Sequence, residues 1–254
     1  MCIVRYRADL KIFQLEIDTM EAKYKRVLLK LSGEALAAGA DGILNFDFIG
    51  EIAQVLKKCV ADGVQIGIIV GAGNIWRGRQ GGKMDRVRAD SMGMLATTIN
   101  ALALQDTFIQ NGLDAVVMTA VDMNTFAEPY TTREAVAALK AGKIVIFGCG
   151  LGAPYFSTDT AAVLRAAEIE ADAVLMAKNI DGVYSADPAK DKNAVKYDEI
   201  TYKEVLEKEL KALDLTATTF CMENGIKVYA FELKDPMNIY RVVKGEKIGT
   251  EIHK

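Results

Sequence analysis

A lysine, a serine and a glycine stand close together at the end of the first apolar run of this chain, and this combination suits phosphate binding. The segment reads Lys30-Leu31-Ser32-Gly33-Glu34. A lysine near a strand end can neutralise a phosphate, and glycine lets backbone N–H groups approach anionic oxygens. The alternative is an ordinary strand-to-loop turn with a solvated lysine.

A second loop of small residues follows the next apolar run and leads to an arginine. It reads Gly71-Ala72-Gly73-Asn74-Ile75-Trp76-Arg77-Gly78, and a guanidinium can close a phosphate cradle by binding with two parallel N–H groups. Its glycine spacing differs from the dinucleotide-binding fingerprint, and Gly82-Lys83 does not complete a P-loop motif. Tight packing of this loop on a helix is the alternative.

The third loop, from Gly148 to Asp159, holds three glycines before the predicted start of a helix. Glycines can shape a backbone around a ligand, and amides at a helix start point towards anions. Asp159 is expected either to cap this helix or to orient catalytic lysines. Capping alone is the simpler explanation of the Ser157-Thr158-Asp159 run.

The fourth loop, from Lys178 to Pro188, combines turn residues with groups that can contact a nucleoside. Tyr184 can stack on a base, and Asp187 can accept a hydrogen bond from a ribose hydroxyl or an amino group. Asp-Gly and Asp-Pro pairs are also common turn signals. Taken alone, the residues of this loop are explained by turn formation.

The composition excludes several kinds of catalytic and metal site. His253 is the only histidine and stands next to the last residue, so the body of the chain offers no imidazole base and no histidine zinc site. The four cysteines lie far apart without a CxxC pair. This spacing is typical of reduced thiols in a cytosolic protein rather than of a disulfide or metal framework.

Charge and hydropathy argue against two kinds of partner. The chain has 31 Lys and Arg against 34 Asp and Glu, a net charge of −3, so nucleic-acid binding is not expected. No apolar run approaches the roughly 20 residues of a membrane span. We therefore expect a cytoplasmic protein that binds neither nucleic acid nor membrane.

The elements that precede the four loops support the interpretation of these loops as parts of one phosphate-binding site. Apolar runs alternate with segments of helical spacing, which predicts an α/β fold with a mainly parallel central sheet covered by helices on both faces. In such sheets ligands bind beyond the carboxyl ends of the strands, where all four loops lie. The expected strands are 27–31, 65–70, 115–118, 143–147, 173–177 and 226–230, and the expected helices are 46–60, 88–110, 132–139, 159–169, 202–210, 215–224 and one after Pro236.

We expect one compact domain over residues 23–254. Residues 1–22 are predicted to be an extension, either disordered or the product of a misassigned start, with Met20 as a plausible initiation site. Charges interrupt the apolar residues of this segment, so it does not form a secretory signal.

Five ordered motifs give the chain a specific resemblance to the bacterial uridylate kinases of the amino acid kinase family. The resemblance extends from about residue 25 to 250. The motifs are Lys30-Leu31-Ser32-Gly33-Glu34-Ala35, Gly71-x-Gly73-Asn74-x-x-Arg77-Gly78, Asp90-x-Met92-Gly93-Met94-Leu95-Ala96-Thr97, Pro154-x-Phe156-x-Thr158-Asp159 and Asp181-Gly182-Val183-x-x-x-Asp187-Pro188.

The resemblance implies a three-layer αβα sandwich and transfer of the ATP γ-phosphoryl group to UMP, with Mg²⁺, in pyrimidine nucleotide biosynthesis. It implies an acceptor lobe over about 23–160 and an ATP lobe over about 161–254. The implied catalytic residues are Lys30, Arg77 and Asp159. The implied ATP-binding residues are Lys30, Leu31, Ser32, Gly33, Gly73, Arg77, Asn179, Tyr184 and Asp187, and the implied UMP-binding residues are Ala72, Asp90, Gly150, Leu151, Gly152, Ala153, Pro154, Tyr155, Phe156 and Ser157.

The family also implies a homohexamer, with activation by GTP and inhibition by UTP as expected forms of control. Three residues depart from its pattern: Leu151 and Ala153 replace residues with a hydroxyl and an amide side chain, and Ala72 stands where glycine is usual, a smaller change. Recognition of uracil would then depend on backbone groups. The segment at Asn179 is also one residue shorter than in close relatives, which leaves the assignment of Asn179 open by one position.

Two other functions are open at this point. One is a kinase of the same fold that phosphorylates a carboxylate, a carbamate or isopentenyl phosphate. The other is a nucleotide-binding protein without catalysis. Retention of Lys30, Arg77 and Asp159 argues against the second, and Asp90 with its Met-Gly-Met-Leu-Ala-Thr neighbours argues for a ribonucleotide acceptor.

Overall fold

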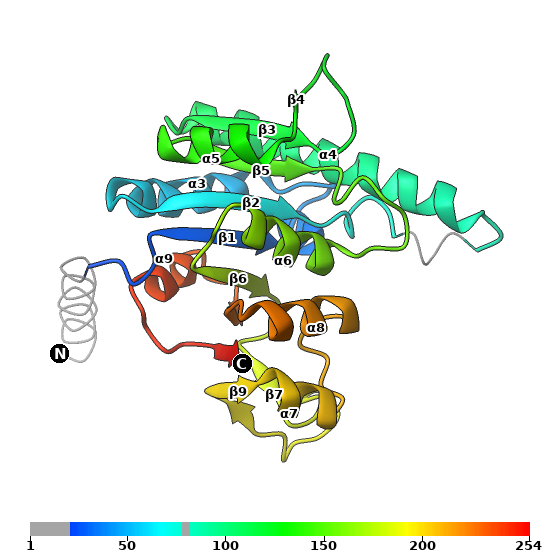
Figure 1. Cartoon of the computed structure of the whole chain (residues 1–254), viewed down its shortest axis with the longest axis vertical. Coiled ribbons are helices and arrows are strands. Elements are labelled where there is room, and N and C mark those ends of the chain that lie inside the picture. The colour runs from blue at the N-terminus through cyan, green and yellow to red at the C-terminus, as the bar shows by residue number, and fades with distance from the viewer. Residues whose placement is uncertain (1–20, 78–81) are drawn as a thin grey trace.

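A nine-stranded sheet forms the centre of the computed structural model, which describes residues 21–77 and 82–254 (Figure 1). The predicted extension at residues 1–22 lies outside this range except for its last two residues, and Gly78 lies outside it as well. Within the described residues, no helix is long and apolar enough to cross a membrane.

The continuous apolar runs form the inner strands, as their sequences predict. The strand order is β4-β3-β5-β2-β1-β6-β10-β11-β9, and every pairing is parallel except that of β10 with β11. The strands are β1 (Arg26–Leu31), β2 (Gln65–Val70), β3 (Ala115–Thr119), β4 (Glu128–Pro129), β5 (Ile144–Gly148), β6 (Ala173–Lys178), β9 (Glu199–Thr201), β10 (Val228–Glu232) and β11 (Thr250–His253), and β7 (Val183–Tyr184) pairs separately with β8 (Lys196–Tyr197).

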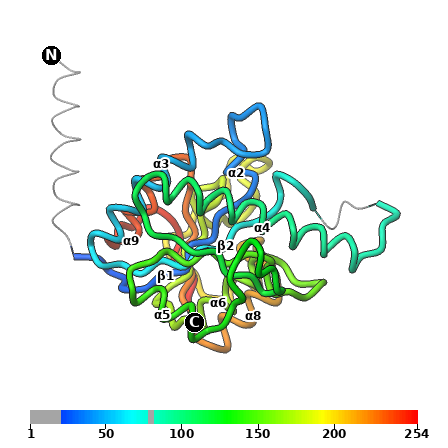
Figure 2. The backbone as a smooth tube through the Cα atoms, turned by 90° about the horizontal axis from the view of Figure 1, so that it is seen from above, coloured from blue at the N-terminus to red at the C-terminus, as the bar shows by residue number. Residues whose placement is uncertain are grey.

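Helices cover both faces of the sheet and produce three layers (Figure 2). Alternate residues of β1 point to opposite faces: Leu29 belongs to one buried cluster and Leu28 to the other. The first cluster contains residues of α2 (Gly33–Ala37), α3 (Phe46–Ala61), α4 (Arg86–Gln110) and α9 (Met237–Val243), and the second contains residues of α5 (Thr132–Lys140), α6 (Thr158–Glu168), α7 (Tyr202–Glu207) and α8 (Leu215–Asn224). The predicted αβα sandwich is confirmed.

One predicted strand is displaced along the chain. We expected 226–230, whereas β10 covers Val228–Glu232. The preceding helix α8 is capped by Gly225, whose φ of 65° is left-handed, a conformation in which glycine commonly follows helices. Ile226 packs against the second cluster before the strand begins, so its apolar character does not mark a strand residue.

Asp62, at the carboxyl end of α3, joins that helix to α9. Its carboxylate accepts a hydrogen bond from the Tyr240 hydroxyl at 2.9 Å and pairs with the Lys244 ammonium at 2.7 Å. The Lys244 side chain is 3% exposed and that of Asp62 is 30% exposed, so the ion pair is shielded from water on the side of the lysine. Burial alone would raise the pKa of Asp62, but hydrogen bonds from Lys244 and Tyr240 outweigh it and hold that pKa below its ordinary value.

We predict that Asp62→Asn lowers the free energy of unfolding at pH 7 by about 2 kcal/mol, because it removes hydrogen bonds to a charged group. A lowered folded pKa stabilises the protein above the unfolded pKa of 3.8 and is lost as the pH falls below it. The wild-type and variant stabilities should therefore converge in acid. Urea unfolding between pH 7 and pH 3 measures both effects.

The matched control is Glu207→Gln, which removes the exposed pair with Lys203 at 3.7 Å. It should change the free energy of unfolding by less than about 1 kcal/mol, as exposed pairs do. An equal effect of the two substitutions would contradict the role given to Asp62.

Candidate active site

The loops after β1 and β2 pack backbone against backbone, and this contact requires glycine at position 33. A Cβ atom there would lie 2.6 Å from the Gly71 carbonyl oxygen and 3.0 Å from the Gly73 nitrogen, and it would also overlap the Asn74 side chain. The predicted phosphate cradle after β2 is therefore held directly against the first predicted phosphate loop.

Two asparagines support the second loop from behind. Asn100, fully buried on α4, donates to the Gly71 carbonyl at 2.8 Å and exchanges side-chain hydrogen bonds with Asn74 at 2.8 and 3.0 Å. Asn74 also donates to the Ile43 carbonyl at 2.6 Å. The loop thus packs on a helix, as one alternative proposed, and still presents Gly73 and Arg77 to a cavity.

Lys30 and Asp159 meet between β1 and α6. The Lys30 ammonium lies 3.1 Å from an Asp159 carboxylate oxygen, and both side chains are largely buried. The hydroxyl of Ser157 caps α6 by accepting from the amides of Asp159 and Thr160 at 3.1 and 3.0 Å. Ser157 therefore performs the capping, and the Asp159 carboxylate orients Lys30.

Asp214 is a site residue that sequence reasoning missed. It caps α8 by accepting from the Ala217 amide at 3.0 Å, and it accepts from the Thr160 hydroxyl at 3.2 Å and from the Ser157 hydroxyl. It thereby ties the start of α8 to the start of α6. An aspartate directly before a helical segment is a capping signal. The sequence could therefore have identified Asp214 as the cap of α8, but not as a partner of Ser157 and Thr160.

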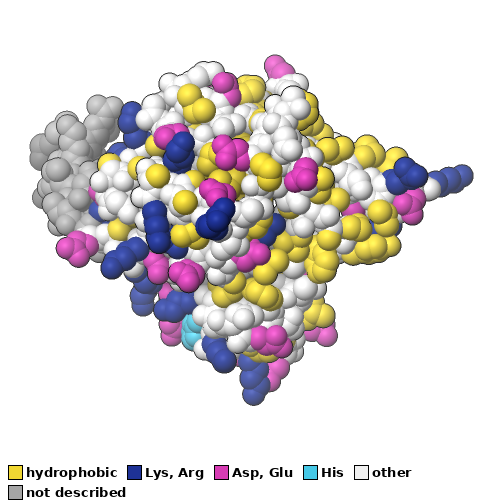
Figure 3. All heavy atoms as spheres, turned by 45° about the horizontal axis from the view of Figure 1, so that its top comes forward, with side chains coloured by type: hydrophobic (Ala, Val, Ile, Leu, Met, Phe, Trp, Pro, Cys, Tyr) yellow, Lys and Arg dark blue, Asp and Glu magenta, His cyan; other side chains and the backbone are white. Residues whose placement is uncertain are grey.

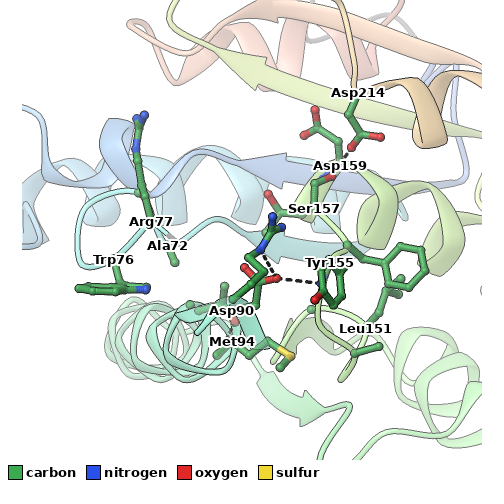
Figure 4. A pocket seen from close by; sticks show the side chains of 18 residues that line it. Ala72, Trp76, Arg77, Asp90, Met94, Leu151, Tyr155, Ser157, Asp159 and Asp214 are labelled. Carbon is green, nitrogen blue, oxygen red and sulfur yellow. Dashed lines mark hydrogen bonds and ion pairs between the residues drawn. The ribbon is translucent and has the colours of Figure 1, made fainter. Parts of the chain in front are cut away.

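A cavity of about 480 Å³ opens beside these residues (Figure 4). It brings together most of the predicted UMP-binding residues with two of the predicted ATP-binding residues. We call it the first cavity; its lining is Ala72, Gly73, Trp76, Arg77, Arg86, Asp90, Gly93, Met94, Thr97, Gly150, Leu151, Ala153, Tyr155, Phe156, Ser157, Thr158, Asp159 and Asp214. Gly152 and Pro154 do not line it.

Arg77 lines the first cavity but makes no hydrogen bond or ion pair with Lys30 or Asp159. Its guanidinium pairs with Glu34, and both side chains are exposed to solvent by 40% or more. In Figure 4 the Arg77 side chain points away from Asp90 and Tyr155. Of the three predicted catalytic residues, Arg77 and Asp159 therefore line the first cavity, and Lys30 is joined to it only through its ion pair with Asp159.

Asp90 connects α4 to the loop after β5. One carboxylate oxygen accepts from Arg86 at 2.7 Å and from the Tyr155 amide at 2.8 Å. The Arg86 guanidinium lies 5.1 Å from the centre of the Tyr155 ring, within the range of a cation–π contact. Tyr155 itself has a φ of 73°, a left-handed conformation that is costly for a non-glycine residue.

A second cavity of about 450 Å³ lies among the elements after β6. We call it the second cavity; its lining is Lys178, Ile180, Gly182, Val183, Tyr184, Ser185, Ala186, Asp187, Pro188, Lys190, Lys208, Glu209, Leu210, Lys211 and Ala212. Tyr184 and Asp187 were predicted there. Asn179 is exposed and lines neither cavity, and neither do Lys30, Leu31, Ser32 and Gly33.

The turn interpretation also holds for this segment. Asp187 accepts from the Ala189 amide at 3.0 Å, and the Tyr184 hydroxyl donates to Asp181 at 2.8 Å. The hydrogen bond to Asp181 raises the pKa of Tyr184. Both side chains therefore shape the loop in addition to facing the second cavity.

Lys178 is the second site residue that sequence reasoning missed. It ends β6, and its ammonium donates to the Ala212 carbonyl. Burial lowers its pKa, and the charge of Asp159 opposes this effect while that of Lys30 adds to it. The charges of both members of the Lys30–Asp159 pair therefore act on the Lys178 ammonium. Its position at the carboxyl end of the strand beside β1 is the signal that could have identified it.

No group of three or more His, Cys, Asp or Glu side chains that could hold a metal ion occurs among residues 21–77 and 82–254. A metal that accompanies a nucleotide does not need such a group, since Mg²⁺ is usually held by phosphates, waters and one or two carboxylates. Asp159 and Asp214 line the first cavity and have the oxygen chemistry that Mg²⁺ prefers.

Comparison with known proteins is consistent across sequence and structure. Residues 25–231 match the model of the amino acid kinase family. The crystal structure of UMP kinase from Bacillus anthracis is similar with a TM-score of 0.87 and 37% identity, over 91% of this chain and 96% of that one.

Two further structures agree. UMP kinase from Ureaplasma parvum has a TM-score of 0.87 and 35% identity, over 91% of this chain and all of that one. Uridylate kinase from Archaeoglobus fulgidus has a TM-score of 0.69 and 30% identity, over 89% of this chain and 99% of that one.

We predict that Gly33→Ala destabilises the protein by about 1–3 kcal/mol, the usual cost of overpacking, because the added methyl group meets backbone atoms that cannot rotate away. Thermal or urea unfolding measures the loss. The control is Gly50→Ala in α3, where a Cβ atom meets nothing within 4 Å. That substitution should stabilise the helix by up to about 1 kcal/mol. Equal stabilities of the two variants would show that the loops can separate.

Proposed function

The chain belongs to the amino acid kinase family, and on that premise we propose that it is a uridylate kinase that transfers the γ-phosphoryl group of ATP to UMP, giving UDP and ADP. The observation that supports this best is the ion pair of Lys30 with Asp159 at 3.1 Å, made at the wall of the first cavity, which Asp159 lines. Lys178 lines the second cavity, and the charge of Asp159 also acts on its ammonium. The similar structures named above are UMP kinases.

The two cavities also support a division into two lobes. Apart from Asp214, the first cavity is lined by residues between 72 and 159, and the second is lined by residues between 178 and 212. We assign UMP to the first and the adenosine of ATP to the second, so that residues 23–160 form the acceptor lobe and 161–254 the ATP lobe. The phosphates of ATP would then extend to Lys30, Ser32, Gly33 and Gly73.

This reaction needs positioning and charge compensation more than proton transfer. The transferred group carries negative charge on its oxygens, and two anionic nucleotides must approach in line. The UMP phosphate is already ionised at neutral pH, so it can attack without a general base. Lys30 and the backbone N–H groups of the glycine loops supply positive potential where that charge develops.

Mg²⁺ would enter with ATP. It would neutralise charge on the nucleotide phosphates, with Asp159 or Asp214 as the carboxylates able to bind it. Asp159 already pairs with Lys30, so its carboxylate would have to bind both the lysine and Mg²⁺. Asp214 already accepts hydrogen bonds from two hydroxyl groups and an amide.

We further propose a homohexamer in the cytoplasm that acts in pyrimidine nucleotide biosynthesis, with GTP activation and UTP inhibition. An apolar stripe on α4 supports subunit contact, because Met92, Leu95 and Ile99 are 39%, 53% and 49% exposed. The amino-terminal half of this helix projects from the body of the molecule, and hydrophobic side chains gather on this projection (Figures 1 and 3). Light scattering would measure the mass of the assembly.

The function is tested by measuring ADP release from MgATP with a panel of acceptors: UMP, CMP, dTMP, acetylglutamate and aspartate. We expect turnover with UMP and none with the two carboxylates. Turnover with a carboxylate alone would assign the chain to another activity of the same fold. ATP binding without turnover on any acceptor would indicate a nucleotide-binding protein.

We predict that Lys30→Ala lowers turnover by about 10²-fold or more, the usual scale for losing one preorganised stabilising group. Steady-state kinetics at saturating UMP and ATP measure the effect, with circular dichroism to verify folding. Lys203→Ala, which removes an ammonium whose side chain is 80% exposed, is the matched control and should keep wild-type turnover. A Lys30→Ala variant within a few-fold of wild type would exclude Lys30 from the mechanism.

We predict that Lys178→Met weakens ADP binding by about 10-fold, since a charge-assisted hydrogen bond contributes about 1.5–3 kcal/mol, while UMP binding stays within a few-fold. An ammonium has three N–H donors, and only one is needed for the Ala212 carbonyl. Lys178→Arg should recover part of the affinity. Calorimetric titration with each nucleotide separates the two cavities, and equal losses for ADP and UMP would indicate a structural role instead.

A further inference from the structure

Arg86, at the start of α4, is a charged residue of the first cavity to which the proposed reaction gives no role. Its Nε donates to Asp90 Oδ2 at 2.7 Å, one helical turn further on, and its guanidinium lies 5.1 Å from the centre of the Tyr155 ring. All three side chains line the first cavity. Arg86 therefore contacts one residue on each of the two elements that form this part of the cavity, the helix α4 and the loop after β5.

The two oxygens of the Asp90 carboxylate have different surroundings. Oδ2 accepts from both Arg86 and the Tyr155 amide, at 2.7 and 2.8 Å. Within residues 21–77 and 82–254, no group donates to Oδ1. The Asp90 side chain is 13% exposed and lines the first cavity, so Oδ1 is the oxygen that is available to a ligand there.

The position of Asp90 indicates which part of an acceptor nucleotide it meets. The acceptor phosphate has to approach Lys30, so it belongs at the end of the first cavity that Asp159 lines. In Figure 4, Asp159, Ser157 and Asp90 follow one another across the cavity. The part of the nucleotide that follows the phosphate is the ribose, which therefore lies beside Asp90.

The chemistry of a carboxylate agrees with this placement. A carboxylate only accepts hydrogen bonds, and it repels a phosphate, so the donors that suit Asp90 are the ribose hydroxyls. The ring N–H of uracil is also a donor, but it lies on the edge of the base farthest from the sugar. An acceptor beside the ribose is therefore not the natural partner of that N–H group.

Arg86 fixes the direction in which the free oxygen points. A carboxylate held by one bond alone can rotate, whereas Arg86 and the Tyr155 amide bind the same oxygen of Asp90 from two elements of the fold. A partner that is oriented in advance does not lose this freedom when the ligand binds. The guanidinium also compensates the negative charge that Asp90 places beside an anionic nucleotide.

We infer that Arg86 is a positioning residue for the recognition of ribose: it holds Asp90 so that Oδ1 accepts from the ribose hydroxyls of the acceptor nucleotide. This inference rests on the proposed function, since it presumes that the first cavity binds UMP. Arg86 acts through Asp90 rather than on the ligand. Loss of Arg86 should therefore weaken the binding of nucleotides that carry these hydroxyls and spare nucleotides that lack them.

The test compares UMP with 2′,3′-dideoxyuridine monophosphate, which has the same base and phosphate but neither hydroxyl. The variant Arg86→Met removes the guanidinium and keeps an apolar stem. Calorimetric titration should show that it weakens UMP binding by about 10-fold, the scale of one hydrogen bond to a charged group. Binding of the dideoxy nucleotide should stay within about 3-fold of wild type, because it does not use that bond. Arg86→Lys, which restores a cation with a single point of contact, should recover part of the affinity for UMP.

The matched control is Arg88→Met, which removes the same charge from an exposed residue of the same turn that does not line the first cavity. It should leave both affinities unchanged. Equal losses for the two nucleotides in Arg86→Met would overturn the inference, because Arg86 would then act on the phosphate, the base or the fold. Unchanged binding of both would overturn it as well. If the wild-type protein does not bind UMP, the proposed function itself fails, so the two failures are distinguishable.

A second measurement separates positioning from a purely structural effect. In an Asp90→Ala background, Arg86→Met should change UMP binding by less than about 3-fold, because the carboxylate that Arg86 orients is gone. In the wild-type background, kcat at saturating UMP should fall less than kcat/KM, since the lost contact is to the ribose and not to the transferred group. A full 10-fold loss that persists without Asp90 would show that Arg86 acts by another route and would overturn the inference.

Discussion

The ion pair between Lys30 and Asp159 is the interaction on which the arrangement of the candidate site depends. Lys30 belongs to the central strand β1 and Asp159 to the first turn of α6, so their 3.1 Å contact joins the sheet to the helix that borders the first cavity. An unpaired lysine in this largely buried position would lose much of its hydration, at a substantial cost. Pairing reduces that cost and holds the ammonium at the carboxyl edge of the sheet. Ser157 makes this possible, because its hydroxyl caps α6 and leaves the Asp159 carboxylate available.

The segment 212–214, just before α8, contacts residues of both cavities. Lys178, in the second cavity, donates to the Ala212 carbonyl, and two residues later Asp214 accepts from Ser157 and Thr160 beside the first cavity. A nucleotide that draws Lys178 towards its phosphates would alter one anchor of this segment while Asp214 keeps the other. The structure therefore places a short, doubly anchored connection between residues that line the two cavities.

Sequence patterns predicted the fold well because its inner strands are continuous apolar runs and its helices have regular spacing. The strand predicted at 65–70 matches β2 residue for residue, whereas two-residue strands such as β7 exist only through their pairing and leave no local pattern. The strand-end rule correctly brought Lys30 and Asp159 together. It could not reveal that Ser157 bonds to Asp214, which is 57 residues away, or Lys178 to Ala212, which is 34 residues away. Nor could it show that the Arg77 guanidinium pairs with Glu34, since rotamer choice depends on neighbours brought close only by folding.

In the proposed kinase, catalysis and choice of substrate would be physically separable. The charged groups would act on phosphates, which all nucleoside monophosphates share, and recognition of the base would fall to the loop after β5. The loop after β5 uses its own polar groups to hold its shape: Cys149 and Tyr155 keep left-handed conformations with φ of 65° and 73°, and their amides are bound by Thr97 and Asp90. Those two amides are not available to a ligand, whereas within the described part of the chain the amides of Gly150, Leu151 and Ala153 have no such partner. The loop therefore holds its strained shape with some of its donors and leaves others facing the first cavity.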